Sequence, residues 1–468
     1  MRILLTGASG FIGQHLLQAL LAEGHEVVCA VRRPERQAGL PPHPRLSTLH
    51  ADFAKDTDKS VWLARLSGVD AVVNAVGIFR ERGAQNFANL HVRTPRALFA
   101  ACAESDDVHM VVQLSTLGAD AEADTPYHLS KKAADDYLTT LPIRAAIVQP
   151  SLVYGADGAS ARVFKAMAAL PFAVRLGDAP QLVQPIHVDD VVAAIVALLR
   201  QRLYVDNHAH NYVDTRVNKG VNKPADNPVN KPVDRRSAGS GMARRIALVG
   251  PQALPFVDYL AALRSAMRMR RQRVLKLPNG LAHGLARLGG WLPGALLDPD
   301  ALRMLDRGNT ADPGPTLRLL GRPARTIASF IADPGAERAR AKLDWLLPIL
   351  RLSLAFVWIA TAIVSAFVYP AAASYDLLAR SGIPPGLQPP MLYGAALFDL
   401  LMGLGILFLR GRPRRWLWRV QGALIGFYTI VIAFKLPEFL VHPYGPLIKN
   451  VPMLAAIWLL AELEKEET

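Results

Sequence analysis

Cysteine is scarce in this sequence, and recognised nucleic-acid-binding motifs are absent. The 468 residues include only Cys29 and Cys102, which lie far apart in the chain. This number and spacing predict neither a disulfide framework nor a metal site, so we expect two buried thiols and no bound metal. The net charge of +14 comes without a nucleic-acid motif, and much of the arginine borders apolar segments. We therefore expect a positive surface that faces membrane lipid, and no nucleic-acid partner.

The N-terminus also lacks the features of a signal peptide. Glycines from Gly7 onward interrupt the apolar run that such a peptide needs, so we expect the N-terminal domain to remain in the cytoplasm. Apolar residues are abundant elsewhere, at 51% of the chain with a mean hydropathy of +0.19, and the excess follows Leu346. That distribution indicates a membrane region in the C-terminal part.

A glycine-rich turn, TGASGFIG, stands close to the start of the chain. It follows an apolar run and precedes an apolar-periodic segment, so the sequence predicts a strand, a turn and a helix. Glycines let a pyrophosphate approach such a turn, and the helix N-terminus attracts phosphate, although the same pattern also suits a plain strand-to-helix connection. We expect a dinucleotide to contact the turn at Thr6, Gly7, Gly10, Phe11, Ile12 and Gly13.

Apolar strands alternate with helical segments up to about residue 200, which predicts a Rossmann-type, doubly wound parallel sheet of the α/β class. Ligands bind at the carboxyl ends of such strands. The second strand ends at Arg32 and Arg33, which favour the 2′-phosphate of NADP(H), or else simply end a solvated strand. Further cofactor contacts are expected in residues that are also common in turns: Asp52, Asn74, Ala75 and Gly77.

Four residues suggest the chemistry of a carbonyl reductase. Tyr127 and Lys131 are four apart on an expected helix, so they share one face, although a surface pair has the same spacing. A phenol is a better proton donor when a neighbouring ammonium stabilises its anion. We expect Tyr127 to donate the proton, Lys131 to assist it and hold the ribose, and either Ser115 or Thr116 to bind the substrate oxygen.

These motifs resemble the short-chain dehydrogenase/reductase superfamily, in its extended or atypical branch with the NAD-dependent epimerases. The resemblance covers residues 1 to about 200 and includes QPSLVYG at 149–155 and PIHVDD at 185–190. The spacing from STLGAD to YHLSK, with VDYLAALR at 257–264, resembles the branch that contains the nucleotide-binding accessory subunit of respiratory complex I. The resemblance implies the same roles for Tyr127 and Lys131. One departure is His91, where relatives commonly have asparagine.

The chain divides into four expected parts. Residues 1–202 form the nucleotide-binding domain, and 203–241, where Val-Asn-Lys recurs, form a flexible low-complexity insertion. Residues 242–341 complete the reductase-like domain with a small substrate-side region. Residues 346–462 contain four apolar segments, at about 346–369, 391–409, 416–434 and 446–461, which predict a bundle of four transmembrane helices. Residues of about 346 to 462 resemble the DoxX-like family of small four-helix membrane proteins, and the motif that carries this resemblance lies at 433–450.

The charges around the apolar segments predict an orientation. The connection between the second and third segments is rich in arginine, which stays on the cytoplasmic side, so we expect both termini in the cytoplasm. Asp399 then lies at mid-membrane, and we expect it to meet Arg351 or to be neutral. The arginines of this connection are Arg410, Arg412, Arg414, Arg415 and Arg419.

Two functions fit these observations. The first is a bacterial inner-membrane enzyme whose cytoplasmic domain is a reductase or epimerase-like domain that uses NADP(H) on a carbonyl or alcohol. A lipid-soluble substrate is a hypothesis that rests on the fusion alone. The second is a non-catalytic NADPH-binding protein that assembles with a respiratory or other membrane partner. The complete pair of Tyr127 and Lys131 favours the enzyme, and the resemblance to the accessory subunit favours the alternative.

Overall fold

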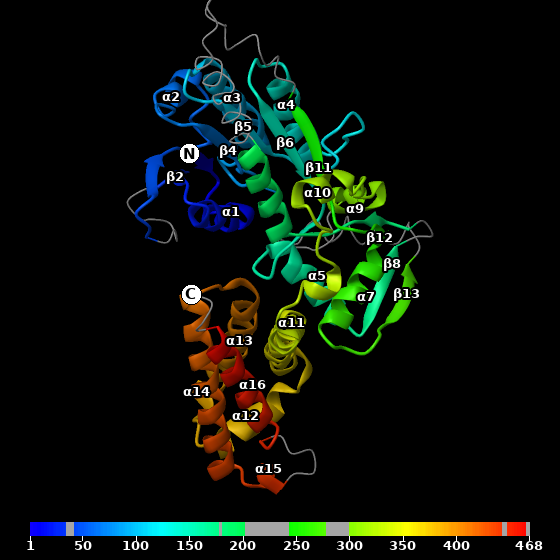
Figure 1. Ribbon diagram of the computed structural model, residues 1–468. Coiled ribbons are helices and arrows are strands. Elements are labelled where there is room, and N and C mark those ends of the chain that lie inside the picture. Colours follow the sequence, from blue (N-terminus) through cyan, green and yellow to red (C-terminus); the bar gives the residue numbers. More distant parts are fainter. Residues whose placement is uncertain (34–41, 177–179, 202–242, 278–298, 442–446, 465–468) are drawn as a thin grey trace, which may run out of the picture. The chain divides into compact units, whose positions relative to one another are not determined.

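The computed structural model describes residues 1–33, 42–176, 180–201, 243–277, 299–441 and 447–464 (Figure 1). The chain forms two compact units, Met1–Arg338 and Ala339–Thr468. The insertion expected at 203–241 lies outside the described residues.

A parallel sheet is the centre of the first unit. Among the described residues its order is β11-β6-β5-β4-β1-β2-β3, and every neighbouring pair is parallel. The chain direction across the sheet reverses between β1 and β4, so their carboxyl ends open onto the crevice where dinucleotides bind in such folds. The predicted Rossmann-type sheet is confirmed. Its strands are β1 (Arg2–Thr6), β2 (Glu26–Val31), β3 (Leu46–His50), β4 (Ala71–Asn74), β5 (Met110–Leu114), β6 (Ala145–Pro150) and β11 (Arg244–Leu248).

Helices cover both faces of the sheet (Figure 1). Ile3 and Leu5 of β1 pack with α1 (Phe11–Ala22) and with the helix over 188–201. Leu4, which points to the other face, packs with α2, α3 and α4. Because both faces are buried, the strands are almost continuously apolar. The second layer consists of α2 (Lys59–Leu63), α3 (Thr94–Glu104) and α4 (Pro126–Thr139).

Short strands and helices complete the first unit beside the carboxyl ends of the sheet. β8 (Phe172–Leu176) pairs with β13 (Arg273–Leu277), and α5 (Ala159–Ala169) packs against α7 (Phe256–Ala266). The remaining elements are β7 (Val153–Tyr154), β9 (Leu182–Val183), β10 (Ile186–His187), β12 (Leu254–Pro255), α9 (Pro299–Arg307), α10 (Gly314–Leu320) and η3 (Ile327–Ser329).

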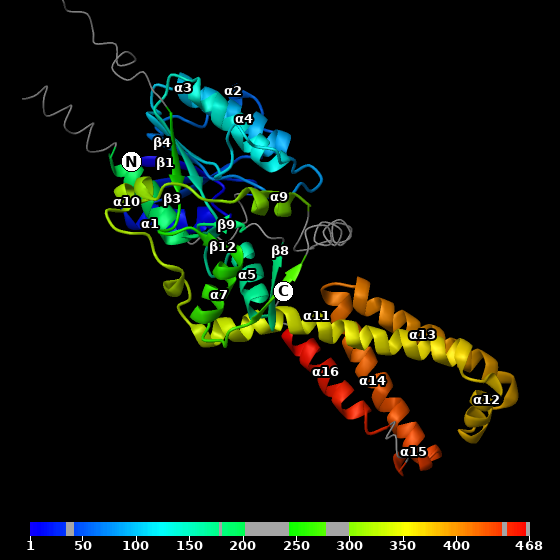
Figure 2. The same ribbon diagram turned by 90° about the vertical axis from the view of Figure 1, so that its right-hand side faces the viewer.

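The second unit is helical. Three helical stretches in the described residues are long and apolar enough to cross a membrane: Pro334–Val368, Pro385–Phe408 and Arg412–Lys435. The fourth expected span is a shorter apolar helix, α16, of 14 residues, which lies beside α14 (Figure 2). The helices are α11 (Pro334–Ile363) with η4 (Val364–Val368), α12 (Ala371–Arg380), η5 (Pro385–Leu387), α13 (Gln388–Phe408), α14 (Arg412–Lys435), α15 (Glu438–Val441) and α16 (Asn450–Leu463).

One buried carboxylate joins three of these helices. Glu464 follows the end of α16, and its carboxylate lies 2.8 Å from Arg351 of α11, 2.9 Å from Arg414 and 3.0 Å from the Trp418 indole of α14. Of the two outcomes expected for Asp399, the meeting with Arg351 is therefore wrong, and a neutral Asp399 stays a prediction. The physical reason is the depth of each carboxylate in the bundle. Glu464 lies at the end of the bundle, beside Arg414 in the first turn of α14, and there it offers Arg351 an anion. Asp399, in contrast, lies in the middle of α13.

Close packing of α13 on α11 gives a test of this bundle. A Cβ atom at Gly403 would lie 2.6 Å from Ile359 Cγ1 and 3.1 Å from the carbonyl oxygen of Ala355. We expect Gly403→Ala to destabilise the second unit by about 1–3 kcal/mol, the usual cost of overpacking. Gly422→Ala is the control, because no atom lies within 4 Å of its Cβ position. Thermal unfolding in one detergent would contradict this packing if both variants had the same midpoint.

Candidate active site

The glycine turn is held tightly against the end of β4. Gly7 has φ +74°, and a Cβ there would lie 2.6 Å from the backbone of Ala75. A Cβ at Gly13 would lie 2.0 Å from the carbonyl oxygen of Gly7, so both positions require glycine. Gly10 is the N-cap of α1 and supplies no side-chain acceptor, which leaves the N–H groups of the first turn for a phosphate.

Thr6 contacts the sheet through its side chain. Its hydroxyl donates a hydrogen bond to Asn74 Oδ1 at 2.6 Å, and both residues are fully buried. Asn74 donates in turn to Gln113 Oε1 at 2.7 Å. Two of the expected cofactor residues, Thr6 and Asn74, thus join β1, β4 and β5 below the crevice through their side chains.

A pocket of about 540 Å³ opens beyond the ends of β2 and β3. Arg32 and Asp52, both expected to contact the cofactor, line it, whereas Arg33 is exposed and is not among its lining residues. Lys55 and Arg82 add two more cationic side chains to the lining. Sequence reasoning missed these two, because neither lies at a strand end.

Lys131 lies between the carboxyl ends of β4 and β5. Its ammonium donates to the carbonyl oxygens of Val76 and Leu114, each at 3.1 Å. A Cβ at Gly77 would lie 3.1 Å from Nζ, so this glycine gives the ammonium room. Burial lowers the pKa of Lys131 to about 8, and the nearby Asp135 opposes that shift.

The Tyr127 phenol lies beside Thr116. Burial raises the pKa of Tyr127, and a hydrogen bond with the Thr116 side chain partly opposes that shift, so the phenol keeps its proton at neutral pH. Ser115 is directed elsewhere: it is buried and donates to the carboxylate of Asp135. Of the two hydroxyls expected to bind the substrate oxygen, Thr116 is therefore the one next to the phenol.

Asp135 was missed by the sequence analysis. It follows Lys131 by four residues, as Lys131 follows Tyr127, so all three lie on one face of α4. Asp135 is fully buried, and burial raises its pKa to about 6 although Ser115 and Lys131 lower it. The Gln113 side chain also lowers the pKa of Asp135, so it lies near this carboxyl. The four-residue spacing was the signal that could have identified it.

His91 stands at the position where relatives commonly have asparagine. It lies in η2 (Ala88–Arg93), is 1% exposed, and its Nε2 accepts a hydrogen bond from the Ile78 N–H at 3.0 Å. Because Nε2 accepts, Nδ1 carries the proton and donates to Ser130 Oγ at 2.8 Å. Burial lowers the pKa of His91 to about 2, so the ring is neutral. It joins the loop after β4 to the helix that carries Tyr127.

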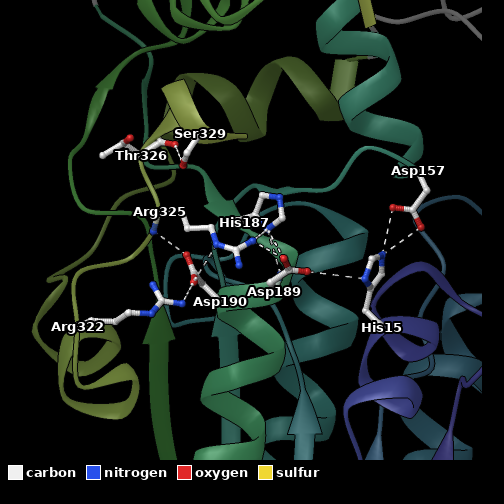
Figure 3. Close-up of polar contacts among 9 residues, drawn as sticks. All are labelled: His15, Asp157, His187, Asp189, Asp190, Arg322, Arg325, Thr326 and Ser329. Atoms are coloured by element: carbon white, nitrogen blue, oxygen red, sulfur yellow. Dashed lines mark hydrogen bonds and ion pairs between the residues drawn. The ribbon is translucent and has the colours of Figure 1, made fainter. Parts of the chain in front are cut away.

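The PIHVDD motif holds the C-terminal part of the first unit (Figure 3). Asp190 is fully buried and accepts from Arg322 Nη2 at 2.6 Å and from the Arg325 N–H at 2.7 Å. His187 Nδ1 accepts from the N–H of Asp189 at 3.2 Å. This cluster attaches the segment after α10 to the helix over 188–201 and to α1. Its other members are His15 and Asp157, which lie 3.1 Å apart.

Two regions of the chain match known families. Residues 3–211 match the NAD dependent epimerase/dehydratase family, and residues 355–458 match the DoxX-like family. The chain joins an NAD-dependent epimerase/dehydratase domain to a DoxX-like domain. This confirms the resemblances drawn from the sequence, and the DoxX-like match with three long apolar helices indicates a membrane protein.

The proteins to which part of this chain is similar include a reductase and a subunit of NADH dehydrogenase. A ceramide reductase of Caulobacter vibrioides is 28% identical over 201 residues, which are 42% of this chain and 61% of that protein. The mitochondrial NADH dehydrogenase (ubiquinone) 1 alpha subcomplex subunit 9 of Arabidopsis thaliana is 28% identical over 209 residues, 42% of this chain and 49% of that protein. A solved UDP-glucuronic acid 4-epimerase from Bacillus cereus has a TM-score of 0.48 at 18% identity, and the match covers 74% of this chain and all of that one.

Substitution of His91 tests its place in the epimerase/dehydratase domain. His91→Leu leaves the part-buried N–H of Ile78 without its acceptor, and we expect it to destabilise the domain by about 1–3 kcal/mol. His91→Asn keeps an acceptor and an N–H donor, so its loss should be smaller. Calorimetry of the full chain would measure both. Equal losses for leucine and asparagine would show that the hydrogen bonds of His91 do not stabilise the domain.

Proposed function

We propose that the protein is a membrane-anchored, NADP(H)-dependent oxidoreductase that acts on a lipid-soluble carbonyl compound or secondary alcohol. The observation that carries this proposal is the arrangement of Tyr127, Thr116 and Lys131 at the carboxyl ends of β4 and β5. These ends adjoin the point where the strand order reverses, so a nucleotide held by the glycine turn would reach the same crevice. The relative named ceramide reductase supports a lipid substrate.

Each of the three side chains has a role in the reduction. When bound, NADPH supplies the hydride that reduces the carbonyl carbon. Tyr127 donates its phenol proton to the carbonyl oxygen, so a secondary alcohol leaves the site, and a solvent proton restores the phenol. The Lys131 ammonium favours the transient phenolate by its charge. The Thr116 side chain lies beside the phenol and lowers its pKa, which makes the phenol a better proton donor.

The preference for NADP(H) is supported by charge at the pocket beyond β2. Arg32, Lys55 and Arg82 line this pocket together with a single carboxylate, Asp52. Asp52 Oδ1 accepts from the N–H of Ala54 at 3.0 Å, and its other oxygen lies 3.9 Å from Lys55. A 2′-phosphate would meet three cations there, whereas a plain ribose hydroxyl would leave them without an anion.

The arginine-rich connection supports a location in the bacterial inner membrane with both termini in the cytoplasm. It lies at the start of α14, where Arg414 and Glu464 also meet, so positive charge and the end of α16 share one end of the bundle. In this orientation the epimerase/dehydratase domain works in the cytoplasm, where NADPH is available.

A second candidate function is a nucleotide-binding assembly protein without turnover. The relative named as a subunit of NADH dehydrogenase favours it. In that case the nucleotide stabilises the first unit, and the second unit contacts a membrane-protein partner. Tight nucleotide binding without NADPH oxidation, across a panel of quinones, long-chain ketones and nucleotide sugars, would support this function over the enzyme.

Cofactor choice is tested at Arg32. A charge-assisted hydrogen bond to phosphate contributes about 1.5–3 kcal/mol, so Arg32→Ala should weaken NADPH binding about ten-fold or more and change NADH binding little. Arg33→Ala is the matched control, because Arg33 is adjacent in sequence but is not among the residues lining the pocket. Calorimetry with both nucleotides gives the affinities. Equal affinity of the unchanged protein for NADPH and NADH would refute the preference.

The proton donor is tested at Tyr127. Tyr127→Phe should lower turnover about a hundred-fold or more, the contribution of a general acid, and leave NADPH affinity nearly unchanged. Tyr137→Phe is the control on the same helix, where the ring lies under the Arg96 guanidinium. Activity on the carbonyl panel is followed by loss of NADPH absorbance. Retained turnover in Tyr127→Phe would exclude this residue as the donor.

A further inference from the structure

Two consecutive residues at the end of β5 contact one face of α4. The carbonyl oxygen of Leu114 accepts a hydrogen bond from the Lys131 ammonium at 3.1 Å, and the Ser115 hydroxyl donates to the carboxylate of Asp135. Lys131 and Asp135 are four residues apart, so they follow each other along one side of the helix. The proposed reduction uses Lys131 but gives Asp135 no part.

The surroundings of Asp135 do little to stabilise its charge. The side chain is fully buried, and its Oδ1 has no hydrogen-bond partner among the described residues. Burial is the largest influence on this carboxyl and raises its pKa to about 6, although the Ser115 hydroxyl opposes that shift. An ionised Asp135 therefore costs the folded domain free energy at neutral pH, so stability does not explain why a carboxylate stands here.

Asp135 has cationic neighbours. Lys131 of α4 and Arg245 of β11 both lower its pKa, and the Gln113 side chain of β5 acts in the same direction. Arg245 already has an anion of its own, because its guanidinium forms an ion pair with the carboxylate of Asp136. Lys131 is therefore the cation for which the charge of Asp135 matters most.

The Lys131 ammonium depends on Asp135 for an opposite charge. In the part of the chain that the structure describes, its hydrogen bonds go to the carbonyl oxygens of Val76 and Leu114, which carry no net charge. Its neighbour His91 is neutral, since burial lowers the pKa of that ring to about 2. Burial also lowers the pKa of Lys131 to about 8, and Asp135 is the group that opposes that shift. Without the carboxylate, the ammonium would lose its proton at a lower pH.

We propose that Asp135 is a positioning residue that keeps Lys131 in its ammonium form and so sets the upper pH limit of the reduction. The inference rests on the proposed function, in which Lys131 acts through its charge on the Tyr127 phenolate. Asp135 is fully buried and out of reach of substrate and nucleotide, so it acts through Lys131. A buried carboxylate that costs stability and sustains a reactive cation is typical of an active site.

Loss of the Lys131 proton is the first ionisation that affects the reduction as the pH rises above neutrality. Asp135, with a pKa of about 6, is already ionised there. The Tyr127 phenol ionises later, because burial raises its pKa above the ordinary value of 10 and the charge of Asp135 adds to that rise. We therefore expect kcat/KM for NADPH oxidation to fall above about pH 8 in the unchanged protein.

Asp135→Asn tests this coupling in the purified full chain. Asparagine keeps a side-chain oxygen for the Ser115 hydroxyl but carries no charge, so Lys131 should lose its proton at a lower pH. We expect the alkaline limb of the kcat/KM profile to move down by about one pH unit or more, the usual effect of removing a nearby opposite charge. Asp136→Asn is the matched control, because it removes a half-exposed carboxylate at the next position of the helix. An alkaline limb in the same place in Asp135→Asn and in the unchanged protein would overturn the proposal.

A purely structural Asp135 gives a different pattern. The folded domain binds a proton at Asp135 more tightly than the unfolded chain, where the pKa is about 3.8, so this group lowers stability as the pH rises from about 4 to about 6. Asp135→Asn removes that loss, and its calorimetric midpoint at pH 8 should be no lower than that of the unchanged protein. A lower midpoint with an equal fall in rate at every pH would assign Asp135 to the fold alone and refute the coupling.

Ser115→Ala decides the proposal if Asp135→Asn does not fold. The Ser115 hydroxyl favours the charged carboxylate, so its removal raises the pKa of Asp135 and weakens the support for Lys131. The alkaline limb should then move to lower pH, by a smaller amount than the loss of the whole charge would cause. In that case an unmoved limb in Ser115→Ala would contradict the proposal.

NADPH affinity separates this inference from the proposed enzyme. Lys131 is expected to hold the ribose, so the affinity measured by calorimetry should fall above about pH 8 and, in Asp135→Asn, from about one unit lower. If no carbonyl compound of the panel is reduced while the affinity shows this shift, the enzyme fails and the coupling holds. If turnover is found but neither its alkaline limb nor the affinity profile changes in Asp135→Asn, the coupling fails and the enzyme holds.

Discussion

The contact of the glycine turn with the end of β4 is the constraint on which the first unit depends. Gly7 touches the backbone at Ala75, and Gly13 touches Gly7, so β1, β4 and the start of α1 meet without any intervening side chain. The buried side-chain hydrogen bonds from Thr6 to Asn74 and from Asn74 to Gln113 also connect β1 with β4 and β4 with β5. A crevice bounded in this way brings the glycine turn and the face of α4 into one fixed geometry.

The second unit depends on a different kind of constraint. Apolar helices in a bilayer gain little from burying apolar surface, so specific packing and polar contacts fix their arrangement. Glu464 supplies such contacts by its ion pair with Arg351 and by accepting hydrogen bonds from Arg414 and Trp418. Gly403 contributes by admitting α13 close to α11. Charged contacts of Glu464 fix one end of the bundle, and the lack of a side chain at Gly403 allows close helix packing in its middle.

Local patterns in the sequence were sufficient for the elements of the fold. The apolar runs predicted the strands because a doubly covered sheet leaves no polar side on its central strands, and the glycine spacing predicted the turn. Pairings between distant residues could not be predicted, because periodicity says nothing about which partner is nearest. Arg351 therefore met Glu464 instead of Asp399, Ser115 turned to Asp135, and His91 replaced asparagine by using both ring nitrogens.

The outermost strand of the sheet comes from beyond residue 242. β11 pairs in parallel with β6, and the Arg322 and Arg325 contacts to Asp190 hold the chain that follows, so the residues on both sides of the segment 203–241 belong to one folded unit. The entropic cost of closing a flexible loop between two fixed ends rises by only about 0.6 kcal/mol for each doubling of its length. A change in the number of residues at this position therefore costs little free energy as long as the sheet, the crevice and the face of α4 stay intact.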